Sequence, residues 1–163
     1  MKKPILFALL LYAVGCAPQK TSSSVPEGKG DTRTREVEYL DEETYKLTEY
    51  ADDKSYGFKE NNPIDVGGAH ESSGPLNERR FLNALLGPNG EKVFYYRAGS
   101  CCHFKTPNGL MNGTGLLDRY RVYYLGGKDT LDIYINMYDK GDLKVPVGFT
   151  SKQARSSDRR TAE

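Results

Sequence analysis

Two alternating segments, residues 117–125 and 130–138, constrain the fold most strongly. Apolar and polar side chains alternate along both, which is the period of a β-strand with one buried face. The residues between them, 126–129, include two glycines and an aspartate, and these residue types favour a reverse turn. We therefore expect an antiparallel hairpin. Its predicted pairs are Tyr124 with Leu131, Val122 with Ile133 and Tyr120 with Ile135.

This register collects the aliphatic side chains of the second strand on one face and leaves a polar, aromatic face opposite. The second face carries Arg119, Arg121, Tyr123, Asp132, Tyr134, Asn136 and Tyr138. Aromatic rings and hydrogen-bonding groups together could bind a ligand. The same side chains could also form cross-strand pairs on a solvated face, or lie partly under another element. The sequence leaves these alternatives open.

Residues 75–86 carry the signs of one principal helix. Ser73 or Gly74 can cap it, and Pro75 suits its first turn. The negative charge of Glu78 near the start would interact favourably with the helix dipole. An apolar stripe begins at Phe81. Shorter alternating segments predict further strands at residues 37–40, 45–50 and 91–97. We expect an α+β fold, a small antiparallel β-sheet with one principal helix.

The N-terminus resembles a lipoprotein signal peptide. Lys2 and Lys3 precede an apolar run of about ten residues, which suits a signal peptide and is too short for a membrane span. Small residues then lead to Cys16, although Ala13 stands where lipoprotein signals usually have leucine. We expect cleavage after residue 15 and lipid on Cys16, with a plain secretory signal as the alternative.

The rest of the chain divides by composition. Residues 16–35 are rich in serine, proline and glycine and predict a flexible tether after the lipidated Cys16. Residues 36–150 predict a single domain, and residues 151–163 a disordered tail. The expected location is the cell envelope, with the lipid as the link to the membrane. Ala17, which is not acidic, favours the outer membrane, with the domain facing the periplasm.

Charge argues against nucleic acid as a partner. The whole chain has a net charge of +1, and loss of residues 1–15 with their two lysines makes it −1. Nucleic-acid binding depends on a basic surface, which this balance does not predict. The expected partner besides the membrane is an envelope protein or ligand that the sequence does not identify.

Cys101, Cys102 and His103 form the one cluster of reactive side chains in the sequence. Outside the cytoplasm thiols tend to oxidise, and with Cys16 acylated these two cysteines have only each other. We expect the pair in a turn between two strands, where a bond would close a strained and reducible ring. Three ligands fall short of the roughly four of a zinc site. Structural, redox and metal-handling roles remain open.

Motifs for catalysis and cofactor binding are absent from the sequence. It contains no G-x-S-x-G nucleophile motif and no glycine-rich phosphate loop. Its aspartates do not have the spacing of a calcium-binding loop. We therefore expect no catalytic residues, no bound metal and no cofactor.

Four stretches resemble a family of small bacterial lipoproteins whose activity is uncharacterised. They read EYADDKSYGF, NPIDVGG, GPLNERRFLNALLGPNGEKVFYYRAGSCCHFKT and GLLDRYRVYYLGGKDTLDIYINMYDKGDLKVPVGFT, and the resemblance covers essentially the whole span from Tyr50 to Thr150. Family members often carry the label 2-dehydro-3-deoxyphosphooctonate aldolase, so the resemblance implies that activity as an alternative. The Cys101–Cys102 pair is the family-like feature, whereas His103 stands where the family typically has proline.

A non-enzymatic role is the leading expectation. The enzyme of that label resembles a (β/α)₈ barrel, which needs about 250 residues of alternating strand and helix. A domain of less than half that size with one helix does not match it. We expect an envelope-anchored lipoprotein that binds a partner or ligand through its sheet face or through residues 101–114. The alternatives are the aldolase, and a thiol-redox or metal-handling module that uses Cys101 and Cys102.

Overall fold

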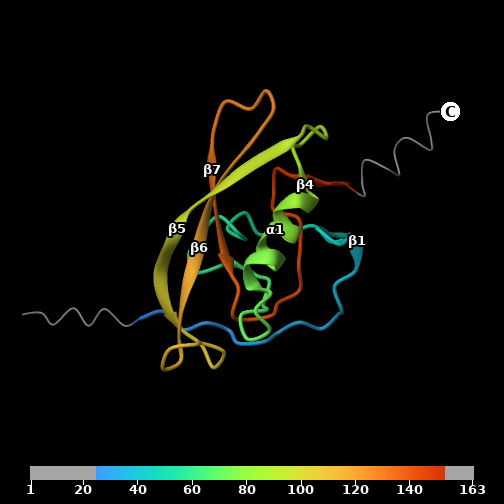
Figure 1. The fold of residues 1–163 in the computed structure, drawn as a ribbon. Coiled ribbons are helices and arrows are strands. Elements are labelled where there is room, and N and C mark those ends of the chain that lie inside the picture. The colour runs from blue at the N-terminus through green and yellow to red at the C-terminus, as the bar shows by residue number, and fades with distance from the viewer. Residues whose placement is uncertain (1–24, 153–163) are drawn as a thin grey trace, which may run out of the picture.

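The structure is a computed structural model that describes residues 25–152. Within that range the chain forms one helix and eight strands (Figure 1). In chain order these are β1 (Tyr39–Asp41), β2 (Thr44–Tyr45), β3 (Ile64–Asp65), α1 (Gly74–Ala84), β4 (Leu85–Leu86), β5 (Val93–Lys105), β6 (Thr114–Tyr124), β7 (Leu131–Asn136) and β8 (Thr150–Ser151). The α+β class is as predicted. The expected signal peptide, Cys16 and nearly all of the expected tail lie outside the described residues.

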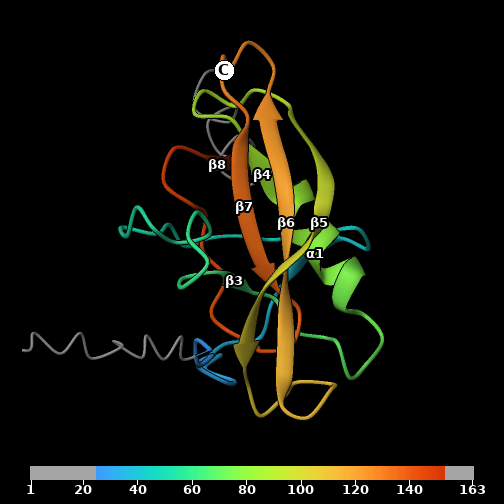
Figure 2. The same cartoon turned by 90° about the vertical axis from the view of Figure 1, so that its left-hand side faces the viewer.

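A four-stranded sheet with the order β3-β7-β6-β5 forms the centre of the fold (Figure 2). Strands β5, β6 and β7 are antiparallel neighbours, as the hairpin pattern predicted. The edge strand β3 instead runs parallel to β7, with Ile64 beside Ile135. The sheet is therefore mixed and not wholly antiparallel. Two further pairs, β1 with β2 and β4 with β8, are antiparallel and separate from this sheet.

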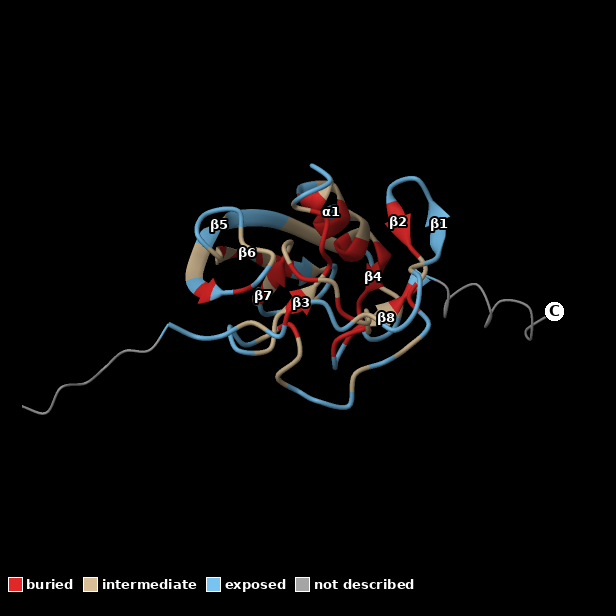
Figure 3. Ribbon diagram, turned by 90° about the horizontal axis from the view of Figure 1, so that it is seen from below, coloured by how far each residue is buried: buried red, intermediate tan, exposed pale blue. Residues whose placement is uncertain are grey.

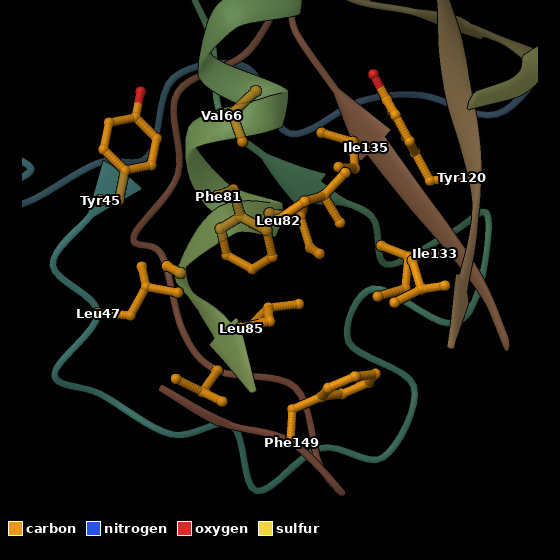
Figure 4. Close-up of a cluster of buried hydrophobic side chains, with 14 residues drawn as sticks. Tyr45, Leu47, Val66, Phe81, Leu82, Leu85, Tyr120, Ile133, Ile135 and Phe149 are labelled. Atoms are coloured by element: carbon orange, nitrogen blue, oxygen red, sulfur yellow. The ribbon is translucent and has the colours of Figure 1, made fainter. Parts of the chain in front are cut away.

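One continuous core lies between α1 and the sheet. Figure 4 shows Phe81 and Leu82 of α1 among the aliphatic side chains of β7, Ile133 and Ile135. Loop residues close the core away from the sheet, where Phe149 is also buried. Burial of this apolar surface stabilises the fold, since each fully buried large side chain contributes about 1.5–3 kcal/mol.

The helix is shorter than predicted at its C-terminal end. It begins at Gly74, after Ser73 at the N-cap position, and ends at Ala84 instead of residue 86. Leu85 and Leu86 leave the helix because they pair in extended conformation with Ser151 and Thr150. This tertiary pairing overrides the helical propensity of two leucines. It also places Ser151 within the folded domain.

The β6–β7 hairpin forms, but its register differs from the predicted one by two residues. Tyr120 pairs with Ile133, not Ile135, and Val122 pairs with Leu131, not Ile133. The connection is therefore longer than the four residues expected, and Leu125 at its tip is 68 % exposed. Because side chains in a strand alternate with a period of two, this shift leaves each residue on its predicted face.

Strand β5 is almost twice as long as the sequence suggested. It was expected to end near Arg97, but it continues to Lys105 and pairs with β6 along its whole length. Cys101 and Cys102 therefore lie inside a strand and not in a turn. The turn itself is formed by residues 106–113. Figure 3 shows that much of β5 is exposed, whereas the facing side of α1 is buried.

Residues 26–33, which the sequence placed in the tether, are attached to the domain. The Lys105 N–H donates to the Pro26 carbonyl at 2.8 Å, and the Gly28 N–H donates to the Lys105 carbonyl. Arg33 donates to the Gly141 carbonyl at 2.9 Å. The folded part therefore begins before residue 36. No helix among the described residues is long and apolar enough to cross a membrane.

Candidate functional site

The sheet face that points away from α1, called the outer face below, carries the side chains predicted as a binding surface. Paired residues of neighbouring strands point to the same side. Arg119 pairs with Tyr134, and Arg121 with Asp132. Since the residues between them, Tyr120 and Ile133, are buried in the core, these four side chains lie on the outer face as predicted.

Near the hairpin tip the outer face is a solvated surface with cross-strand pairs. The Tyr123 ring stacks on Phe94, with 5.5 Å between ring centroids, and the Lys92 ammonium lies 5.0 Å from the Phe94 centroid. Arg121 donates to Asp132 at 3.1 Å. In these pairs the charged and aromatic side chains interact with one another. The cross-strand pairs alone therefore account for the polar and aromatic composition of this half of the face.

Two of the predicted binding residues, Asn136 and Tyr138, do not form part of an exposed surface. Asn136 is 2 % exposed, and its amide donates to Asp65 at 2.8 Å and to Asp139 at 2.9 Å. Tyr138 lies beyond the end of β7 and packs its ring edge-on to Phe104, with centroids 6.0 Å apart. Of the alternatives left open by the sequence, a face partly covered by other elements applies at this end of the sheet, where Asn136 is buried and Tyr138 is half-buried.

A groove of about 520 Å³ opens at the covered end of the outer face. Its floor consists of side chains from three strands, Phe104 of β5, Leu117 of β6 and Tyr134 of β7. Its walls come from the connection before β3, from the N-terminal segment and from the disulfide region of β5. The wall residues are Phe58, Lys59, Glu60, Asn61, Pro26, Cys102 and His103.

A smaller recess of about 80 Å³ shares Phe104 and Leu117 with the groove. Asn136 and Asp65 line it, and they place amide and carboxyl groups beside an otherwise apolar floor. Burial, together with the nearby charge of Asp139, raises the pKa of Asp65 to about 6 despite the Asn136 hydrogen bond. The recess therefore holds a carboxyl group that gains a proton in mildly acidic conditions.

Cys101 and Cys102 form a disulfide at the wall of the groove. Both residues are only half-buried. Cys102 has a φ of +56°, in the left-handed region that side-chain-bearing residues seldom adopt. It is the one non-glycine residue within a described strand that has a positive φ, since Ser72 and Asn112 lie in turns.

Cys102 is also the extra residue of a β-bulge. Cys101 pairs with Leu117 and His103 with Leu116, so β5 has one residue here that β6 does not match. Phe104 then pairs with Gly115. Because Leu117 and Gly115 share a face, the bulge directs Phe104 onto the outer face and into the groove floor.

A second polar cluster, on the inner face, was not predicted. Glu78 of α1 is 0 % exposed and accepts a hydrogen bond from the Tyr120 hydroxyl at 2.8 Å, while its Oε1 has no partner among the described residues. Burial and the neighbouring Asp118 raise the pKa of Glu78 to about 8. Asp118 is itself bound by Arg97 at 2.7 Å. Glu78 therefore lies beyond the first turn of α1, where the sequence had placed it to favour the helix dipole, and it packs as a buried acid.

Sequence reasoning singled out Tyr134, Cys102 and His103, and its possible binding segment, residues 101–114, includes Phe104, but it missed the remaining groove residues. Phe58–Asn61 and Pro26 reach the groove through long-range contacts that no local pattern encodes. Their one sequence signal was position, since turn-forming residues surround the short β3 segment. Among residues 25–152, no group of three or more His, Cys, Asp or Glu side chains is placed to hold a metal ion.

Comparisons with protein-family models, with curated proteins and with solved structures find no match to this chain.

Proposed function

We propose that this chain is an envelope-anchored, non-enzymatic lipoprotein that binds a small amphipathic ligand in the outer-face groove. Lipid on Cys16 would hold the domain at the membrane, most suitably the outer membrane on its periplasmic side. The observation that carries the proposal is the groove, whose volume of about 520 Å³ falls in the range of small-molecule sites.

The lining favours a ligand with an apolar part and hydrogen-bonding edges. Phe104 and Leu117 are largely buried and present an apolar floor, and Tyr134 adds a half-buried ring. An apolar group seated there would displace water mainly from the Tyr134 ring, because Phe104 and Leu117 are only 6 % and 2 % exposed. Exposed Asn61 on the wall can donate and accept hydrogen bonds.

The charges around the groove favour a ligand without a strong net charge. Lys59 and Glu60 are adjacent wall residues of opposite sign, so their fields largely cancel. A phosphate-bearing sugar would require several cations directed at one point. This wall offers one lysine beside one glutamate, which supports binding of an uncharged molecule over binding of a sugar phosphate.

The proposal is tested by the molecules that copurify with the mature lipidated protein from its native envelope. Extraction and mass spectrometry should release one compound in roughly equimolar amount to the protein. Asn61→Trp fills the groove from an exposed wall position and should abolish copurification. Leu125→Trp places the same ring on the exposed hairpin tip and should retain the compound. Equal yields from both variants, or no compound from the unaltered protein, would contradict the proposal.

A further inference from the structure

We propose that the Cys101–Cys102 disulfide is a redox switch for the groove. The bond preserves the bulge that directs Phe104 onto the groove floor, and reduction releases both the bulge and the floor. This inference rests on the proposed binding function, because it assigns a form of regulation to the same groove.

The disulfide is accessible to a reductant. Both cysteines are half-buried, and Cys102 lines the open groove beside exposed His103. A thiolate must approach a sulfur atom directly to exchange with it. The bond joins adjacent residues, so its reduction opens an eight-membered ring and leaves the rest of the chain connected as before.

The bond supports an otherwise unfavourable backbone conformation. Cys102 has a φ of +56° inside a strand, where the neighbouring residues are extended. For a residue with a Cβ, this conformation is disfavoured by about a factor of ten in population. Ring closure ties the Cys102 side chain to Cys101, so the residue cannot relax to an extended conformation while the bond is intact.

The groove floor depends on that conformation. Cys101 pairs with Leu117 and Phe104 with Gly115, which puts residues three apart on one face of β5. Without the extra residue, alternation would direct Phe104 to the opposite face. The Phe104 ring also covers Gly115, where an added Cβ would lie 2.7 Å from the ring. Loss of the bulge therefore removes an aromatic ring from the floor.

The reaction balances as ordinary thiol–disulfide exchange. Two equivalents of an envelope thiol reductant, or one dithiol, supply two electrons and two protons. The first thiolate attacks one sulfur and forms a mixed disulfide, and the second releases the reductant as its own disulfide. The protein gains two thiols at Cys101 and Cys102, and an oxidant of the disulfide class reverses the step.

Hydrogen exchange on the full lipidated chain in detergent tests the switch without any ligand. Reduction with dithiothreitol should form two alkylatable thiols and accelerate exchange in residues 100–105 and 114–118 by about tenfold. Residues 74–86, which form α1 and β4 and supply core side chains, should be unchanged and thereby report that the fold is intact. Unchanged exchange after both thiols form, or failure of the folded protein to form thiols, would overturn the switch.

Two double variants separate the bond from the bulge. Cys101→Ala with Cys102→Gly removes the bond but tolerates a positive φ, so its exchange should match the oxidised protein with or without reductant. Cys101→Ala with Cys102→Ala should match the reduced protein in both conditions. Identical exchange in the two variants would overturn the switch. The absence of a copurified compound from the unaltered protein, or equal yields from Asn61→Trp and Leu125→Trp, would instead remove the proposed ligand function, so the two failures are distinguishable.

Discussion

Cys101 and Phe104 lie on the same face of β5 although they are three residues apart, because the bulge at Cys102 adds one residue between their partners on β6. In a regular strand these two side chains would point to opposite faces. The relationship joins the one reactive cluster of the chain to the floor of its groove. The disulfide and part of the groove lining therefore belong to one short segment of the edge strand β5.

Lipidation is the first prediction. Replacing Cys16 by serine should abolish labelling with a radioactive fatty acid and move the protein out of the detergent phase, since the acyl chains supply the membrane affinity. Cys102→Ser is the matched control and should keep both the label and the detergent partition. An unchanged partition of Cys16→Ser would show that another feature holds the protein at the membrane.

The two faces of the β6–β7 hairpin should differ in their contribution to stability. Ile133→Ala removes a side chain that is 0 % exposed and should lower the free energy of unfolding by about 2–5 kcal/mol. Arg121→Ala breaks a partly exposed ion pair with Asp132 and should cost less than about 1 kcal/mol. Urea unfolding measures both. Equal losses would contradict the assignment of faces.

The buried acid Glu78 should make stability depend on pH. The pKa of Glu78 is about 8 in the folded protein, whereas the ordinary pKa of a glutamate, 4.5, applies to the unfolded chain. Between pH 4.5 and pH 8 the folded state therefore binds one proton that the unfolded state has lost. The free energy of unfolding should therefore fall as pH rises through that window. The facing groups are Tyr120, Asp118 and Arg97.

Glu78→Gln tests the origin of that dependence. The amide cannot ionise, so the variant should have a flatter stability profile from pH 5 to 9 and should exceed the unaltered protein at the alkaline end. Glu71→Gln, on the exposed surface beside Lys140, serves as the control and should leave the alkaline slope in place. Parallel profiles for Glu78→Gln and the unaltered protein would assign the slope to other groups.

The aldolase activity implied by family resemblance should be absent. Condensation of phosphoenolpyruvate with a sugar phosphate requires cations that hold two phosphates. Arg79 and Arg80 are adjacent on α1, where neighbouring side chains diverge, and the Arg80 guanidinium already donates to the Glu42 carbonyl at 2.7 Å. The mature chain should release no inorganic phosphate from the two substrates, with or without divalent metal. Steady turnover that is lost in Arg79→Ala would restore the label.

Local pattern predicted the faces of the hairpin but not its register. Alternation assigned Ile133 to the core and Arg121 to the outer face, and the structure agrees with both. The two-residue shift came from the connection, because six residues separate β6 from β7 where turn residues suggested four. A register shift of two residues leaves every side chain on the same face of the sheet, so the alternation pattern is the same for both registers.

The chemistry of the cysteine pair was predicted better than its position. Adjacency and an oxidising location suggested a bond between Cys101 and Cys102, which the structure contains. The pair was expected in a turn between two strands, but the segment continues β5 as a bulged strand. The groove escaped prediction for a related reason. Phe58 and Phe104 meet at it through tertiary folding, and they lie far apart in the sequence.

Photo-crosslinking in living cells tests the central claim, ligand binding in the groove, most directly. A benzoylphenylalanine at position 59 replaces an exposed wall lysine, and the same residue at position 125 replaces the exposed leucine of the hairpin tip. After irradiation, intact-mass analysis should show a small-molecule adduct from position 59 and none from position 125. An adduct from position 125 alone, or a protein crosslinked at position 59, would contradict a small-molecule groove.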